Sequence, residues 1–137
     1  MPYRKISFEN EHIYHIYNRG VEKRKIFTSN RDYQRFIQSF IYYTFAENKL
    51  RFARFRPVDM FTLNKKRVEI LAYCLMPNHF HLILRQISDG GISNSIGQLS
   101  NSYTKYFNTK YKRVGPLFQG NFKAVWIENT EQLVHVS

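Results

Sequence analysis

His79 and His81 have the spacing in this sequence that most suggests chemistry, because a single bulky apolar residue separates the two imidazoles. Successive side chains of a β-strand point to opposite faces, so both imidazoles share one face if residues 79–85 form a strand. Phe80, Leu82 and Leu84 would share the other face, where they can pack on a core. The pair therefore indicates a face that could hold a divalent metal ion.

A histidine pair in a strand also occurs without any ligand, as a solvated or hydrogen-bonded pair. A structural zinc site usually takes four ligands, and neither a Cys-x-x-Cys nor a His-Glu-x-x-His motif accompanies the pair in the sequence. Spacing alone therefore leaves metal binding and an unliganded pair both open.

The chain is strongly basic and rich in aromatic residues. It carries 21 Lys and Arg against 10 Asp and Glu, a net charge of +11, and 17% of its residues are aromatic. Basic charge interleaved with aromatic rings suits a polyanion whose bases can stack, such as single-stranded nucleic acid. The alternative is that the aromatic side chains only fill the core.

The length of 137 residues fits one domain. Cys74 is the single cysteine and lies in an apolar run, so we expect a buried, inert thiol and no disulfide framework. No charged-then-apolar signal segment opens the sequence, and no apolar run approaches the ~18 residues of a membrane span. These features predict a soluble, cytoplasmic protein.

The first half of the chain predicts a strand, a helix and a second strand. Residues 12–17 are aromatic and β-branched, which is typical of a strand. Ser29 is expected to cap a helix over residues 30–48, with Asp32 as its capping-box partner. Residues 68–75 form a near-continuous apolar run, which predicts a central strand buried on both faces.

The second half predicts a hairpin, a helix and a last strand. Residues 76–78 form a turn, so the strand at 79–85 should pair antiparallel with the strand before it. Apolar residues recur at helical spacing from Ile92 to about residues 110–113, and Gly115 with Pro116 stops this helix. Residues 122–127 then predict the fourth strand.

The order strand, helix, strand, strand, helix, strand predicts an α+β fold of the ferredoxin-like, split β-α-β-β-α-β type. The sheet is expected to be antiparallel, with the two helices on one face. Residues 51–66 are expected to form a loop or an edge strand. Asn129 or Thr130 could cap a short third helix, although the residues that follow are too few for a stable isolated one.

Four segments carry a family resemblance, in chain order and across nearly the whole sequence. They read YHIYNRG at residues 14–20, AYCLMPNHFHL at 72–82, SYTKYFN at 102–108 and GPLFQGNFK at 115–123. With these segments the chain resembles the single-tyrosine HUH transposases, and among them the REP-associated tyrosine transposases.

The resemblance implies a reaction on single-stranded DNA beside an imperfect hairpin. In this family a histidine pair and a third polar ligand hold Mg²⁺ or Mn²⁺ under a scissile phosphate, and a tyrosine attacks the phosphorus to leave a 5′-phosphotyrosine. His79 and His81 stand at the family's histidine positions. A divalent ion can neutralise the charge of the reacting phosphodiester and orient its oxygens. Some relatives are dimers, so a homodimer is also possible.

The chain departs from the family pattern at the nucleophile, which sits on a helix after the fourth strand. Residues 131–137 resemble the approach to that helix. We therefore expect one HUH transposase-like domain over residues 1–137, truncated before the nucleophile helix, with the catalytic tyrosine beyond Ser137. Tyr103 and Tyr106 are expected on the second helix, with Tyr103 in the core.

Three readings of function follow. The first is a transposase domain that binds single-stranded or hairpin DNA and, when complete, cleaves and rejoins it. The second is a non-catalytic module that binds such DNA, and the third is an RNA-binding ferredoxin-like domain, because that fold hosts many functions. Basic residues at the expected strand and helix ends are the candidate DNA contacts: Arg19, Lys23, Arg24, Lys112, Arg113 and Lys123.

Overall fold

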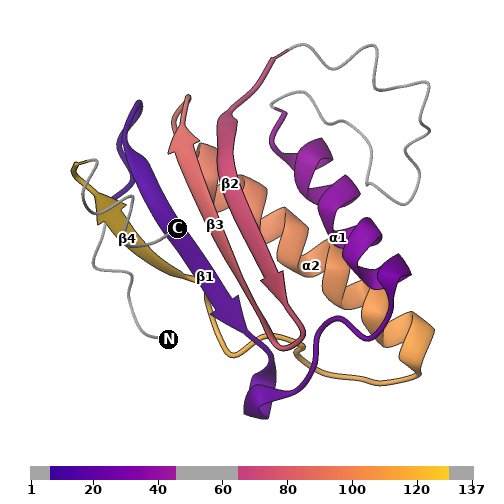
Figure 1. Ribbon diagram of the computed structural model, residues 1–137. Coiled ribbons are helices and arrows are strands. Elements are labelled where there is room, and N and C mark those ends of the chain that lie inside the picture. The colour runs from indigo at the N-terminus through magenta and orange to yellow at the C-terminus, as the bar shows by residue number, and fades with distance from the viewer. Residues whose placement is uncertain (1–6, 46–64, 130–137) are drawn as a thin grey trace.

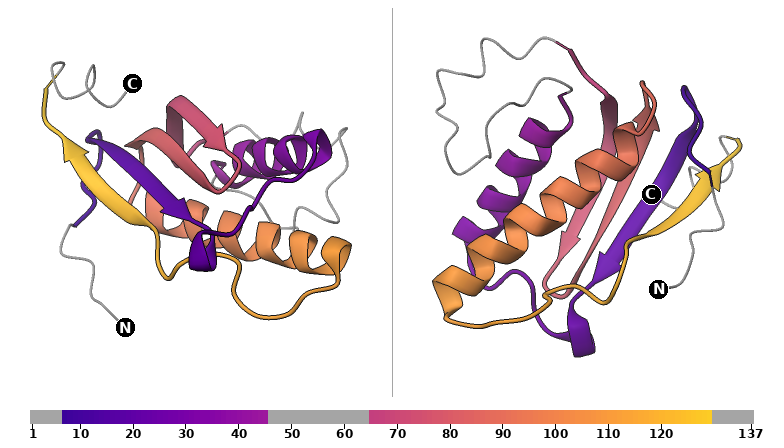
Figure 2. Two further views of the ribbon diagram at one scale, coloured as in Figure 1. Left: turned by 60° about the horizontal axis from the view of Figure 1, so that its bottom comes forward. Right: turned by 180° about the vertical axis from the view of Figure 1, so that it is seen from behind.

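The computed structural model describes residues 7–45 and 65–129, which form a four-stranded sheet with two helices packed on one face (Figures 1 and 2). In chain order the elements are β1 (Ile13–Arg19), the short 3-10 helix η1 (Val21–Lys23), α1 (Asn30–Tyr43), β2 (Val68–Met76), β3 (His79–Gln86), α2 (Gly91–Tyr111) and β4 (Lys123–Ile127). The strand order is β2-β3-β1-β4, and every neighbouring pair is antiparallel. The predicted ferredoxin-like plan is confirmed.

The core lies between the sheet and the two helices. Phe80, Leu82 and Leu84 of β3 are almost fully buried there, together with Tyr14 and Ile16 of β1. This confirms the predicted division of β3 into a core face and a histidine face. The core face is the one that α1 and α2 cover, and the histidine face is the opposite one (Figure 2).

Helix α1 begins as predicted and ends earlier. The Ser29 hydroxyl accepts a hydrogen bond from the Asp32 amide at 3.3 Å, as an N-cap does. The predicted end at residue 48 is wrong, because the helix stops at Tyr43 and the Thr44 hydroxyl donates to the Ile41 carbonyl at 2.6 Å. Ile41, near the end of α1, is exposed.

Strand β2 is an edge strand, which corrects the prediction of a central strand buried on both faces. It pairs with β3 alone among the described strands, and of its nine residues only Val68 is buried. Cys74 is exposed, so the predicted buried thiol is also wrong. Both corrections have the same physical reason: Cys74 pairs with His81 and faces away from the helices, on a strand that no other described strand pairs with on its outer side.

Helix α2 and the segments around it follow the prediction closely. Lys112 closes α2 in the left-handed conformation with φ 53°, a common way to end a helix. Tyr103 is fully buried in the core, as predicted. The predicted third helix and residues 51–64 lie outside the described residues. Within the described part of the chain, no helix is both long and apolar enough to cross a membrane.

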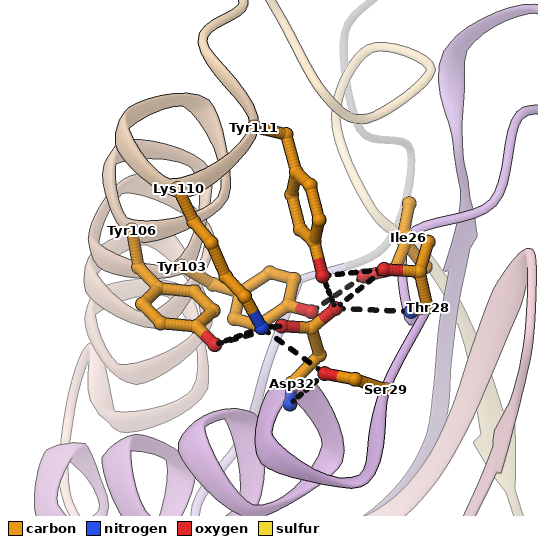
Figure 3. A network of polar contacts seen from close by, with 8 residues as sticks. All are labelled: Ile26, Thr28, Ser29, Asp32, Tyr103, Tyr106, Lys110 and Tyr111. Carbon is orange, nitrogen blue, oxygen red and sulfur yellow. Dashed lines mark hydrogen bonds and ion pairs between the residues drawn. The ribbon is translucent and has the colours of Figure 1, made fainter.

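A buried carboxylate joins the start of α1 to the end of α2 (Figure 3). Asp32 has no exposed surface, and its two oxygens accept hydrogen bonds from Tyr106 at 2.7 Å, Lys110 at 2.8 Å and Tyr111 at 2.6 Å. The Thr28 amide and hydroxyl also donate to it, each at 3.0 Å. Burial raises the pKa of this carboxyl, but the hydrogen bonds from Lys110, Tyr111, Thr28 and Tyr106 outweigh it and hold the pKa well below its usual range.

The same region fixes the segment that leads into α1. The Tyr103 hydroxyl donates to the carbonyl of Ile26, which is itself fully buried. Burial, then the nearby Asp32 charge, raises the pKa of Tyr103, so this phenol stays protonated and able to donate. Side chains of α2 therefore anchor residues 26–32 through several hydrogen bonds.

Candidate metal and nucleic-acid site

The histidine face of the sheet is built by β3 and its neighbours. His79 and His81 project from β3, and the antiparallel register pairs Tyr17 of β1 and Cys74 of β2 with His81. His15 lies two residues before Tyr17 on the same face of β1. These side chains are not covered by α1 or α2, which pack on the opposite face (Figure 2).

Each of the two histidines is paired through its Nδ1 atom. His79 Nδ1 lies 2.7 Å from Oδ1 of Asn78, and His81 Nδ1 lies 2.8 Å from Nε2 of His15. The two imidazole rings are 5.1 Å apart between centroids and nearly perpendicular. The described contacts therefore engage Nδ1 of both rings, and a metal ion would have to approach Nε2.

The surroundings of His81 and His15 favour their neutral forms. Burial, then the neighbouring His79, lowers the pKa of His81, and burial, then His81, lowers the pKa of His15. A neutral imidazole keeps the lone pair that a metal needs. Among the described residues no group of three His, Cys, Asp or Glu side chains is arranged to hold a metal ion, so the two histidines would need a further ligand from elsewhere.

His15 is the residue of this face that sequence reasoning missed. Its distance from His81 in the sequence is 66 residues, and only the β1–β3 register brings the two rings together. A signal was present, since His15 and Tyr17 alternate with the core residues Tyr14 and Ile16 along β1. The strand order was needed to place that face beside β3.

The histidines lie at the end of the sheet where three chain segments are tied together. In the turn between β2 and β3, the Asn78 carbonyl accepts a hydrogen bond from the Gly20 amide at 2.9 Å. The Pro77 carbonyl accepts hydrogen bonds from the amides of Ile26 and Phe27. The loop after α2 joins them, because Leu117 accepts from the Val21 amide. These segments meet near the lower end of the sheet in Figure 1.

The candidate DNA contacts lie around this end. Arg19 ends β1 beside His79 in the register, and Lys23 lies in η1 just beyond it. Lys123 begins β4 and pairs with Tyr17, which places it on the histidine face. All three of these side chains are exposed.

The other three candidates surround the C-terminal end of α2. Lys112 is exposed, and the guanidinium of Arg24 lies 5.9 Å from the ring centroid of Phe107. Arg113 donates to Oδ1 of Asn108 at 2.6 Å and to the Pro116 carbonyl at 3.0 Å. Burial, then the charge of Arg24, lowers the pKa of Arg113, so the two guanidinium groups are close enough to repel each other.

A cleft of about 850 Å³ opens on the helix side of the sheet, between α2 and the loop that leads to β4. Ser100, Asn101, Thr104 and Lys105 of α2 line one wall, and Asn121 lies in the loop opposite. No sequence pattern predicted this cleft, because its walls come from segments that are far apart along the chain.

Comparison of the sequence with known protein families identifies the family of this chain. Residues 9–135 match the family described as Transposase IS200 like. The chain belongs to the IS200-like transposase family. The described fold is that of a transposase-family domain, and the resemblance noted in the four sequence segments is confirmed.

Solved structures show the same fold for this transposase-family chain. A REP-associated tyrosine transposase bound to a REP hairpin matches with a TM-score of 0.60 and 17% identity, covering 99% of this chain and 68% of that one. A protein from Deinococcus radiodurans R1, provisionally described as a transposase, matches with a TM-score of 0.55 and 11% identity, covering 98% and 94%. A comparison with curated proteins gives no match.

Proposed function

We propose that this chain binds single-stranded DNA beside a hairpin, and that the histidine face holds Mg²⁺ or Mn²⁺ through His79 and His81. In the complete reaction the DNA is cleaved and rejoined through a 5′-phosphotyrosine. Membership of the IS200-like transposase family supports the proposal, as does the likeness to a transposase bound to a REP hairpin. The observation that carries it is the pairing of both histidines through Nδ1, which leaves both Nε2 atoms for a ligand.

The donor set suits the proposed ions. Imidazole is a ligand of Mn²⁺, and Mg²⁺ keeps several of its own waters when few protein ligands are present. When bound, a divalent ion supplies charge neutralisation at a phosphodiester. The chain's own contribution is to hold the two imidazoles on a central strand, in a sheet end that several backbone hydrogen bonds keep rigid.

Removal of the histidines tests the metal site. We expect wild-type protein to bind Mn²⁺ weakly and the His79→Ala/His81→Ala variant to lose that binding, measured by electron paramagnetic resonance titration. His12→Ala is the matched control, because His12 stacks on Trp126 at 5.1 Å and not on the histidine pair. Equal affinity in the wild type and the double variant would reject the assignment.

The basic end of the sheet predicts salt-sensitive binding of hairpin DNA with single-stranded flanks. Neutralising Z phosphates of a single strand gives a log–log salt slope of roughly −0.7Z. Alanine at any one of Arg19, Lys23, Arg24, Lys112 or Lys123 should therefore make the slope shallower by about 0.7. Fluorescence anisotropy at several salt concentrations measures it.

Lys65→Ala is the control for these variants. Lys65 is exposed and precedes β2, whose first residue pairs with the last residue of β3, so it lies at the far end of the sheet from His79. Its loss should leave the salt slope unchanged. A slope that does not respond to any of the five substitutions, or tighter binding of plain duplex, would contradict the proposed DNA surface.

A non-catalytic hairpin-binding module is the second candidate function, and the positions of the tyrosines favour it for the residues described. Tyr14 and Tyr103 are buried on the helix side, whereas Tyr17 shares the histidine face with its ring 5.9 Å from that of His81. Tyr17 is held in β1 between β3 and β4, while an attacking oxygen must reach about 3–3.5 Å from phosphorus in line with the leaving group.

We therefore expect no covalent adduct when residues 1–137 are incubated with labelled hairpin DNA and Mn²⁺ and run on a denaturing gel. Tyr17→Phe is the informative variant. A slow-migrating protein–DNA band that disappears in Tyr17→Phe would make Tyr17 the nucleophile and overturn this prediction. The homodimer, the cytoplasmic location and a catalytic tyrosine beyond Ser137 stay predictions.

A further inference from the structure

We infer that His15 and Asn78 are positioning residues, each accepting a hydrogen bond from Nδ1–H of a metal-site histidine so that His79 and His81 both present an unprotonated Nε2. The inference rests on the proposed metal site and adds two residues to it. The contacts that carry it are the 2.7 Å approach of His79 to Asn78 and the 2.8 Å approach of His81 to His15.

The first contact fixes the tautomer of His79. The Oδ1 atom of an amide can only accept a hydrogen bond, so Nδ1 of His79 must carry the proton. A neutral imidazole has one N–H and one lone pair, and the lone pair is then on Nε2. Asn78 lies in the two-residue turn before β3, and its own carbonyl is anchored by the Gly20 amide at 2.9 Å.

The second contact allows two tautomers of His81, of which one is compatible with a metal ligand. Two ring nitrogens 2.8 Å apart share a single proton, which belongs either to His81 Nδ1 or to His15 Nε2. If His15 donates, the proton of neutral His81 occupies Nε2 and blocks a metal ion. If His15 accepts, Nε2 of His81 is free. Metal-ligating histidines almost always donate their other N–H in this way, which fixes ring orientation and raises the basicity of the ligand nitrogen.

The geometry also argues against His15 as a third ligand. Its Nε2 is the atom engaged with His81, and its ring lies nearly parallel to that of His81, with centroids 5.0 Å apart and planes within 21°. Rings that meet edge to edge through these two nitrogens do not aim two lone pairs at one point. The absence of a three-residue metal cluster in the described part of the chain agrees with this.

Three variants separate positioning from simple packing. His15→Ala removes the acceptor, His15→Gln restores an oxygen near the position of Nε2, and His12→Ala removes a histidine that stacks on Trp126 instead. We expect His15→Ala to weaken Mn²⁺ binding about 10- to 100-fold, the usual loss for such partners. His15→Gln should recover most of the affinity and His12→Ala should match wild type, with circular dichroism melts confirming that all three fold.

Spin-echo spectroscopy of bound Mn²⁺ counts the imidazoles that coordinate it. Two are expected in the wild type and still two in His15→Ala at saturating Mn²⁺. Three in the wild type, or full affinity in His15→Ala, would overturn the inference. If the wild type binds no Mn²⁺, the proposed function fails, and NMR of the ring nitrogens decides the inference separately: a proton on Nε2 of His79 or His81 refutes it, and protons on both Nδ1 atoms support it.

Discussion

Replacement of Asp32 by alanine is expected to lower the free energy of unfolding by about 1–3 kcal/mol, the usual cost of leaving buried hydrogen-bond donors without their acceptor. Asp32 is fully buried and receives hydrogen bonds from Tyr106, Lys110, Tyr111 and the Thr28 amide. Alanine would leave these donors without their acceptor. Since a typical domain is stable by only about 5–15 kcal/mol, urea titration should show a large shift of the midpoint.

Asp89→Ala is the matched control for this variant. Asp89 is exposed and accepts one hydrogen bond within the described residues, from Asn10 at 2.9 Å, so its loss should change the stability by about 0.5 kcal/mol or less. A comparable loss in both variants would show that the buried contacts of Asp32 contribute no more than a surface carboxylate does.

The charge of Asp32 also predicts a sensitivity to acid. Its pKa in the folded protein lies below the ordinary aspartate value of about 3.9, so the unfolded chain takes up the proton first as the pH falls. The stability that the carboxylate contributes is therefore fully present above about pH 4 and is lost progressively below it. Asp32→Asn should remove this part of the pH dependence and leave a flatter profile of stability between about pH 2 and 5.

Gly20→Ala is expected to destabilise the fold by about 1–3 kcal/mol, because a Cβ at this position has no room. It would lie 2.2 Å from the backbone oxygen of Arg24 and 3.0 Å from a methyl carbon of Ile26. The carbonyl belongs to a segment held by η1 and by the turn before β3, so it cannot move without breaking those hydrogen bonds.

Gly97→Ala provides a control with the opposite expected sign. A Cβ on Gly97 would meet nothing within 4 Å, and the residue lies inside α2. Alanine in a helix interior should therefore raise the stability by about 0.5–1 kcal/mol. Thermal unfolding of the two variants beside the wild type measures both signs, and a Gly20→Ala protein as stable as the wild type would refute the steric reason.

Much of the fold could be predicted because local patterns specify it. The alternation of β3, a tight turn before it and the Ser29 cap each depend on residues close together in sequence, and all three are present in the structure, although Met76 of the predicted turn belongs to β2. The place of β2 at the sheet edge could not be predicted in this way. An apolar run fits either a central or an edge strand, and the strand order is decided by the packing of distant segments.

The candidate site, like the fold, could be predicted from local patterns only in part. His79 and His81 could be singled out from their spacing, whereas the contact of His15 depends on the β1–β3 register. Asp32 was expected only as a capping residue, and its burial depends on three α2 side chains that no local pattern places beside it. Spacing identifies candidate side chains on one strand or helix. The side chains that contact them from other elements can be placed only when the order and packing of the strands and helices are known.

The turn formed by Pro77 and Asn78 has a consequence for how the protein opens. Its two carbonyls accept hydrogen bonds from the amides of Gly20, Ile26 and Phe27, so the end of this hairpin cannot fray while those bonds persist. The three amides should exchange with solvent deuterium at a common, slow rate, as members of one cooperative unit. A ligand bound through the two β3 histidines would slow that exchange further, so the amides of a distant chain segment would report its occupancy.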